Sequence, residues 1–343
     1  MAVDNLTEPD LRAGRGLGLA WASLGVVYVV WGSTYLAIRL VVETMPPLLS
    51  GGARFLVSGI VLMIGILVFA GRGALRMTRA QLGTAMLAGL MLPAIGNGLV
   101  VIAEQHVASG LAALLVASVP LYVVVLRRMF GERASMITVG GVVLGMAGLA
   151  VLVFAGPVEG AHGAAWWGPW LVIVAALSWA TGSVLSTRLP VPPNPFALAS
   201  VEMLTGGTVM LAAGFVGGER LDVGAISLTS WIWWFYLATV GGILAYSAYV
   251  YVLGKLPVST VATYAYVNPV IAVLLGVVVV DERFGPVQFL GGVVVVAAVV
   301  LVVRGERGSR RGTVDPPPGE PAVGTPGEAP CTGTVSDRDG GRG

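Results

Sequence analysis

Ten apolar runs, each close to the ~20 residues that a membrane-spanning helix needs, follow one another along most of the chain. The segments between them carry charges, glycine or proline, as in "GRGALRMTR", "RRMFGERAS" and "RLPVPPNP". The runs lack the alternation of apolar and polar residues that marks the strands of a membrane barrel. We therefore predict an all-α polytopic membrane protein with ten transmembrane helices, over residues 17–38, 47–69, 80–103, 107–127, 135–154, 167–187, 196–216, 231–253, 258–280 and 285–303.

The low charge content excludes most classes of soluble protein. Of 343 residues, 56% are hydrophobic and 11% are charged, whereas about 25% are charged in an average soluble domain. The net charge of +2 does not favour nucleic acid as a partner, and the expected partner is the lipid bilayer. Cys331 is the single cysteine, and His106 and His162 lie near predicted loops, so we expect no cofactor and no metal site.

The distribution of basic residues predicts the orientation of the helices. With residues 1–16 as a cytoplasmic N-terminal segment, fourteen basic residues fall on the inner side and only Arg39, Arg220 and Arg283 fall in outer loops. This bias satisfies the positive-inside rule in one direction only. An even number of spans then places both termini in the cytoplasm, and the Pro- and Gly-rich residues 304–343 are expected to form a disordered tail. The near absence of lysine hints at a GC-rich bacterial coding sequence.

The chain contains the same pattern twice. Aligning Trp31 with Trp179 superimposes the second helices of two halves, residues 17–154 and 167–303, and matches Arg54 with Glu202. Later in each half a proline precedes an acidic residue and an arginine, as in Pro269 followed by "DERFG". Because each half has five spans, the second half must enter the membrane from the opposite face. Such inverted repeats are typical of secondary transporters, with the binding site between them near the midplane; duplicated channels are the alternative.

Three segments also resemble a known family. They are "VVWGSTYLAIRLVVETMPPLLSGGARFLVSG", "EQHVASGLAALLVASVPLYVVVLRRMFGER" and "VSTVATYAYVNPVIAVLLGVVVVDERFG". They resemble the two halves of an EamA-type carrier of the drug/metabolite transporter superfamily, over about residues 19–303. The second copy has Asp281 where the first has glycine before the Glu-Arg pair. The resemblance implies ten helices and the export or exchange of small metabolites across the plasma membrane, here the inner membrane of a bacterium, without naming the substrate.

Two charged residues lie inside predicted spans. Arg54 is about seven residues into the second run, or ~10 Å from its outer end at 1.5 Å per residue. Glu202 is equally deep in the seventh run, measured from the inner end, so the two are not expected to pair directly. Arg54 either extends to the outer headgroups or faces a cavity, where it would bind a substrate carboxylate or phosphate. Glu202 is the candidate for proton coupling, with a structural hydrogen bond as the alternative.

Prolines and amides mark the candidate midplane site. Pro93, Pro120 and Pro269 each remove a backbone donor within a span, which is tolerated where protein or a water-filled cavity surrounds the backbone. Pro120 and Pro269 occupy corresponding places in the two repeats. Asn97 and Asn268 are candidates to line the site, or else to satisfy the interrupted backbone.

Small and aromatic residues complete the set of candidates. Ser33 and Thr34 follow Gly32 and could present hydroxyls to a cavity, although small residues more often serve close helix packing. Trp31 and its repeat mate Trp179 are candidates to close the cavity. Among the tyrosines of spans 8 and 9, we select two that could stack a flat substrate, with packing as the alternative: Tyr246 and Tyr264.

The sequence thus predicts a secondary transporter of small metabolites such as amino acids or drugs. We expect an exporter that works by alternating access with proton coupling or exchange; a passive channel or facilitator is the second hypothesis. An enzyme is not expected because the spans contain neither Cys nor Asp, and no phosphate-binding G-x-x-x-x-G-K-[ST] loop supports an ATP-driven pump. Gly141 and Gly145 form a G-x-x-x-G step that suits either internal packing or a homodimer contact.

Overall fold

The computed structural model describes residues 8–132, 134–154, 165–256, 258–261 and 263–311. Every regular element longer than one residue in these ranges is helical, which confirms the predicted all-α class. The long helices are α1 (Glu8–Val42), α2 (Pro47–Phe69), α7 (Met136–Phe154), α8 (Gly168–Ser186), α9 (Pro195–Val216), α13 (Tyr264–Val280) and α14 (Pro286–Arg311). Cys331, His162 and most of the predicted tail lie outside the described residues.

Three further spans are built from shorter helices joined end to end. They are α3 (Arg79–Gly89), η2 (Leu90–Asn97) and α4 (Gly98–Ala103); α5 (Ser109–Val116) and α6 (Val119–Met129); and α10 (Leu228–Tyr236), η4 (Leu237–Leu244) and α11 (Ala245–Leu253). The short helix α12 (Val258–Val261) precedes α13, and single turns η1 (Arg72–Leu75) and η3 (Val223–Ala225) lie in two loops.

Nine helical stretches in the described part of the chain are long and apolar enough to cross a membrane. They correspond to nine of the ten predicted spans. The ninth prediction, residues 258–280, differs: its helix α13 has 17 residues and is preceded by the separate turn α12. The first helix also begins earlier than predicted, at Glu8, although its apolar part starts at Leu17.

Spans 3 and 8 each contain a π-helical segment. In the first repeat η2 includes Pro93, as the loss of a backbone donor predicts. In the second repeat η4 occupies the equivalent place without a proline and contains Gly241 and Gly242, which the sequence analysis did not anticipate. A carbonyl in each segment accepts a hydrogen bond from a serine of another helix: Met91 O from Ser178 at 2.8 Å, and Ala238 O from Ser58 at 2.7 Å. Such partners are required wherever membrane-embedded backbone departs from the α-helix.

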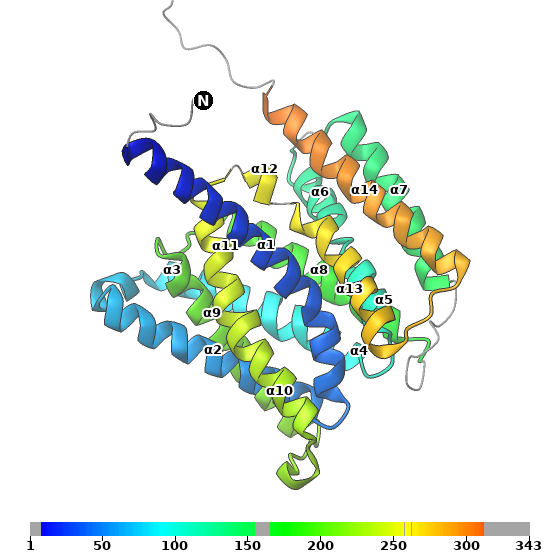
Figure 1. Cartoon of the computed structure of the whole chain (residues 1–343), viewed down its shortest axis with the longest axis horizontal. Coiled ribbons are helices and arrows are strands. Elements are labelled where there is room, and N and C mark those ends of the chain that lie inside the picture. The colour runs from blue at the N-terminus through cyan, green and yellow to red at the C-terminus, as the bar shows by residue number, and fades with distance from the viewer. Residues whose placement is uncertain (1–7, 133, 155–164, 257, 262, 312–343) are drawn as a thin grey trace, which may run out of the picture.

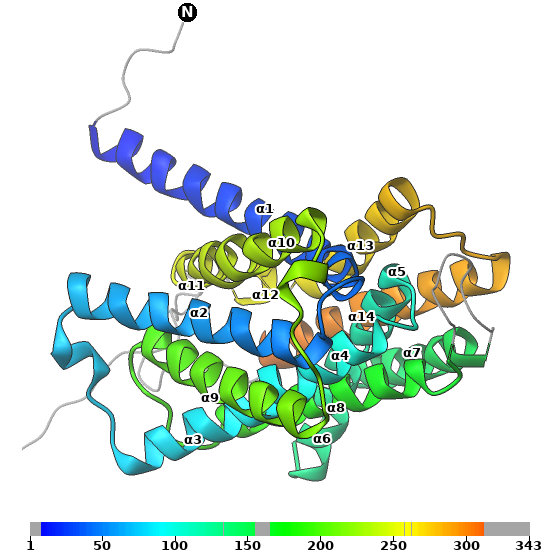
Figure 2. The same cartoon turned by 90° about the horizontal axis from the view of Figure 1, so that it is seen from below.

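Equivalent helices of the two repeats pack against each other. Figure 2 shows α2 lying along α9, and Figure 1 shows α7 lying along α14. At the first contact, a β-carbon added to Gly52 would lie 2.8 Å from the carbonyl oxygen of Gly207, and the converse distance is also 2.8 Å. At the second, Gly141 and Gly145 face Ala298 of α14. The G-x-x-x-G step therefore serves packing within the chain.

Candidate functional site

Most of the predicted site residues fall into two groups, one around Trp31 and one around Arg54. The first is an aromatic cluster on α1, α11 and α13. The ring of Trp31 lies 5.1 Å from that of Tyr249 and 5.4 Å from that of Tyr264, and the two tyrosine rings are 5.9 Å apart. Tyr246 continues the cluster at 6.4 Å from Tyr249. All four side chains are partly exposed, so each leaves part of its surface uncovered by the protein as well as packing on its neighbours.

Glu202 lies next to this aromatic cluster. It projects from α9, whose first turn also contacts Tyr246: the tyrosine hydroxyl donates to the carbonyl of Pro195 at 3.3 Å, and its ring is 6.4 Å from Phe196. The carboxylate of Glu202 is near enough to interact electrostatically with Tyr246. Among the described residues it has no hydrogen-bond or ion-pair partner, and its side chain is partly exposed. The structural hydrogen bond considered for Glu202 is therefore not formed in this conformation.

Asn268 and its neighbours close the far side of the cluster. With its amide nitrogen facing the carbonyls of Tyr264 and Tyr28, Asn268 donates to both at 3.2 Å. The hydroxyl of Tyr28 is hydrogen-bonded to Thr263. Asn268 thus ties α13 to α1 directly before Pro269, which is buried inside α13.

The hydroxyls after Trp31 serve packing. Thr34 donates to the carbonyl of Trp31 at 2.7 Å, and Ser33 donates to that of Val30 at 2.8 Å while its oxygen lies 2.6 Å from the Tyr236 hydroxyl. A β-carbon on Gly32 would come within 2.8 Å of Ile271, so α1 and α13 approach closely there.

Pro120 and Trp179 lie outside the aromatic cluster. Pro120 occupies the first turn of α6 after the break that follows α5. Trp179 is 38% exposed on α8, and its ring packs near Gly96 of η2 rather than near Trp31, its repeat mate. The two tryptophans therefore have different environments in this conformation.

Arg54 belongs to the second group, in the other half of the bundle. Its side chain is 6% exposed and donates through Nη2 to the amide oxygen of Asn97, while its guanidinium carbon lies 4.6 Å from the ring centre of Phe55. Of the two alternatives for Arg54, extension to the headgroups is not the arrangement in this conformation, because the side chain is enclosed by protein. A void of only about 10 Å³ adjoins it, too small for a metabolite. This half of the bundle is closed.

Three charged side chains lie near Arg54, at the end of the bundle that the arginine bias predicts to be the outer one. The sequence analysis did not select them as a site. Arg39, Glu104 and Glu282 are 4%, 2% and 1% exposed. The guanidinium of Arg39 lies 3.6 Å from Glu282. Glu282 also accepts hydrogen bonds from the backbone N–H groups of Ser109 at 2.6 Å and Gly110 at 3.0 Å, and from the Ser109 hydroxyl at 2.8 Å.

Burial raises the pKa of the Glu104 carboxyl well above its usual range, and the negative charge of Glu282 raises it further. Arg39 and Arg54 act in the opposite direction without cancelling these effects. Neither carboxyl oxygen of Glu104 accepts a well-formed hydrogen bond from the described residues. A protonated, neutral Glu104 fits this environment.

The pH dependence of stability tests the burial of Glu104. The folded chain holds the proton more tightly than the unfolded chain, so stability should be greatest below the pKa of an unfolded glutamate, about 4.3. It should then fall as the pH rises toward the higher folded-state pKa. Glu104→Gln cannot titrate and should show a smaller fall. Thermal unfolding in detergent between about pH 4.5 and about pH 9 measures the difference; parallel curves for the two proteins would contradict the assignment.

A second ion-pair group lies at the opposite end of the molecule. Glu132 accepts from Arg127 Nε at 2.6 Å, and its other oxygen lies 2.5 Å from Arg188. The Arg188 guanidinium also stacks 4.3 Å from the ring centre of Phe130. The side chains of Arg188 and Glu132 are 33% and 39% exposed, so this group is hydrated. Glu132 and Glu282 therefore both form ion pairs with arginines that are distant in sequence.

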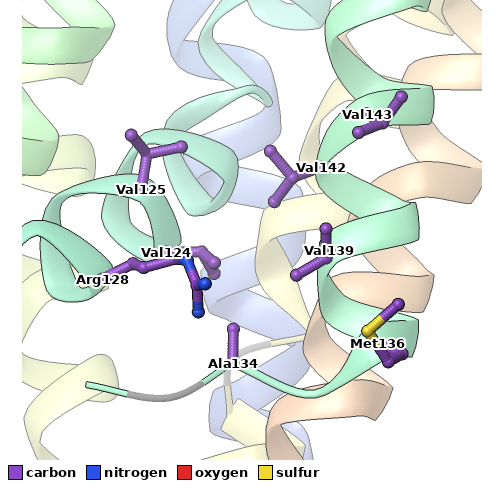
Figure 3. Close-up of a pocket in the computed structure, with 8 residues that line it drawn as sticks. All are labelled: Val124, Val125, Arg128, Ala134, Met136, Val139, Val142 and Val143. Carbon is purple, nitrogen blue, oxygen red and sulfur yellow. The ribbon is translucent and has the colours of Figure 1, made fainter. Parts of the chain in front are cut away.

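A larger cavity lies elsewhere, between α6 and α7. Its volume is about 480 Å³, and its lining is mostly valine with Arg128 as the one charged side chain (Figure 3). None of the predicted site residues lines it. The aromatic cluster with Glu202 is therefore a better candidate for a substrate site than this apolar space.

Comparison with known proteins places this arrangement in a family. The EamA-like transporter family matches residues 16–154 and again residues 166–304. The chain is 39% identical over 287 residues to YedA, an uncharacterized inner membrane transporter of Escherichia coli K12, with 83% of this chain and 91% of that protein covered. It is 26% identical over 292 residues to an E. coli K12 protein named "Probable amino-acid metabolite efflux pump", with 82% and 94% covered.

A solved crystal structure shares the fold. It aligns with a TM-score of 0.57 and 19% identity, over 84% of this chain and 98% of the other. At that identity the likeness concerns the fold alone, whereas the double family match covers most of the sequence and confirms the resemblance that the repeated segments indicated. This chain belongs to the EamA-like transporter family and is a membrane transporter rather than an enzyme.

Proposed function

We propose that the protein is a secondary transporter that exports small metabolites across the bacterial inner membrane by alternating access, driven by protons or by exchange. Membership of the EamA-like family and the printed names of two relatives, an inner membrane transporter and an amino-acid metabolite efflux pump, support this proposal. No phosphate-binding loop for ATP is present in the sequence, in keeping with a secondary mechanism.

The topology that we propose has ten transmembrane helices in two inverted repeats, with both termini in the cytoplasm. The nine long apolar helices found among the described residues, together with the shorter α13, would supply the ten spans. The packing of α2 on α9 and of α7 on α14 pairs equivalent helices, which supports a two-fold relation between the repeats. The arginine bias sets the direction.

One observation carries the proposed site: an unpaired, partly exposed carboxylate beside an aromatic cluster, in a bundle whose other half is closed. Glu202 is also the only acidic residue within the apolar spans of the described chain. A carboxylate attracts an ammonium group, and aromatic faces stabilise cations and pack against apolar side chains. The substrates that fit best are therefore amino acids and related amine-bearing metabolites.

In this proposal the described conformation is open toward the cytoplasm. Glu202 and the rings of Trp31, Tyr249 and Tyr264 would receive substrate from the inside. Arg54 and Asn97 would become accessible when the outer half opens, and they could then contact the carboxylate of a zwitterionic substrate. Repeat inversion allows the two halves to exchange these roles.

Counterflow in proteoliposomes tests the function. Vesicles containing the purified full chain and loaded with unlabelled amino acids should accumulate a labelled amino acid transiently from outside, and an imposed proton gradient should sustain its accumulation. A proton moving down 100 mV yields ~2.3 kcal/mol, enough for roughly a fifty-fold substrate gradient at one proton per substrate. Equilibration without counterflow or accumulation would identify a passive channel and reject the proposal.

A further inference from the structure

Two acid–arginine pairs occupy equivalent positions in the two repeats, at opposite ends of the bundle. We call Arg39–Glu282 the outer pair and Arg188–Glu132 the inner pair. Each pair joins the repeats, because the arginine comes from the end of the first helix of one repeat and the acid follows the fourth helix of the other. Exchanging the two repeats therefore exchanges the two pairs.

The backbone before each acid has the same unusual geometry. Glu132 follows Gly131, which has φ 87°, and Glu282 follows Asp281, which has φ 53°; Asp281 is the only residue other than glycine with positive φ in the described chain. The N–H of Glu132 donates to Arg127 O, and that of Glu282 to Gly276 O, both at 3.1 Å. A left-handed residue that ends a helix turns the following chain back over the helix end. In both repeats the acid thus directly follows a left-handed residue, and its N–H group bonds back to the preceding segment.

The surroundings of the two pairs differ strongly. The side chains of the outer pair are 5% and 0% exposed, whereas those of the inner pair are 33% and 39% exposed. Glu282 also accepts three hydrogen bonds at the start of α5, which belongs to the other repeat. A β-carbon on Gly276 would overlap Glu282 Oε2, so the absence of a side chain there makes room for the carboxylate.

We infer that the two pairs are positioning residues for transport, which hold opposite ends of the path closed in alternate states. In the described conformation Glu282 joins α13, α1 and α5 and keeps the outer end shut. The hydrated inner pair would take the equivalent buried arrangement when the inner end closes. Such a pair shifts the equilibrium between the two states of the transporter only by the difference between its free energy when buried in one state and its free energy when hydrated in the other. This inference rests on the alternating access proposed above.

The test is labelling of a reporter cysteine in the outer half. Val101 is 2% exposed and borders the small void beside Arg54, so Val101→Cys in a Cys331→Ser background should react with an impermeant maleimide only when the outer end opens. Glu282→Gln weakens the outer pair and should speed labelling about tenfold, which corresponds to a shift of about 1.4 kcal/mol. Glu132→Gln weakens the inner pair and should slow labelling relative to the parent.

A faster labelling rate in one variant and a slower rate in the other distinguish a positioning role from general destabilisation, because general destabilisation would speed labelling in both variants. If Glu282→Gln does not fold, Arg39→Gln removes the same pair from the other side and should also speed labelling. Equal labelling rates, or changes in one direction for both pairs, would overturn the inference. Counterflow assayed on the same proteins distinguishes a failure of the proposed transport function from a failure of the proposed role of the pairs. Substrate flux without opposite changes in labelling rate would overturn the role of the pairs alone. Opposite changes in labelling rate without flux would support the role of the pairs and overturn the transport function.

Discussion

Glu202→Gln is expected to abolish proton-driven accumulation while leaving the protein folded. Glutamine has nearly the shape of glutamate but cannot exchange a proton in the physiological range, and the apolar spans of the described chain contain no other acidic side chain. Accumulation at 100 mV should fall from roughly fifty-fold to none, since the driving force of ~2.3 kcal/mol per proton is no longer coupled to substrate. Uptake into proteoliposomes with and without a proton gradient measures this change.

The matched control for this prediction is Glu202→Asp, which keeps a carboxyl group at the same place. Accumulation should persist in that variant, although at a different rate because the shorter side chain sits farther from Tyr246. Counterflow in Glu202→Gln at constant pH reports whether substrate still binds. Undiminished accumulation in Glu202→Gln would show that the proton, if one is coupled, is carried elsewhere.

Gly52→Leu is expected to produce the largest loss of stability among single substitutions in the contact of α2 with α9. A β-carbon at this position would lie 2.8 Å from Gly207 O and 2.8 Å from the backbone nitrogen of Leu211, and neither backbone atom can move independently of its helix. Overpacking a well-packed core costs about 1–3 kcal/mol, and here the helices themselves must separate. The yield of folded protein in detergent and its thermal unfolding temperature should both fall sharply.

Gly65→Leu provides the control on the same helix. It adds the same side chain to α2, but a β-carbon there meets nothing within 4 Å. Its stability should match or slightly exceed that of the parent because leucine has the higher helix propensity. Similar losses for both variants would show that the close approach of α2 and α9 does not hold the repeats together.

Much of the fold could be predicted because apolar length alone identifies helices that cross a membrane. Nine predicted spans correspond to long apolar helices, and the duplicated Trp and Pro patterns marked the two segments that the family matches. The break before α13 and the π-helical segment η4 were not predicted. At η4 no proline marks the interruption, and its partner Ser58 lies on a helix distant in sequence.

The candidate site was predicted only in part, since composition does not reveal which side chains meet. Trp31, Tyr246, Tyr264 and Glu202 were selected and lie in one region. Glu104 was missed because a single acid next to a loop normally indicates a hydrated turn, and only the packing around it shows that it is buried. The outer pair had a signal in the sequence, namely that Arg39 and Arg188 occupy matching places, as do Glu132 and Glu282.

The hydroxyls of Ser33 and Thr34 and the guanidinium of Arg54 show in the same way that the sequence does not reveal which groups a side chain contacts. Ser33 and Thr34 bond to the carbonyls of their own helix, as small polar residues commonly do. For Arg54, side-chain length permits either the headgroup region or the protein interior, and the position of Asn97 on a neighbouring span decides between them. Such a choice depends on tertiary contacts that spacing along one helix does not specify.

Labelling of two loops from opposite sides of the membrane tests the inverted arrangement most directly. Gly73 and Val223 lie in the loops after the second helix of each repeat, and both are exposed. In a Cys331→Ser background, the account predicts that Val223→Cys reacts with an impermeant maleimide in intact cells and that Gly73→Cys reacts only after permeabilisation. Reaction of both positions from the same side would contradict the inverted repeats and the alternating-access mechanism that depends on them.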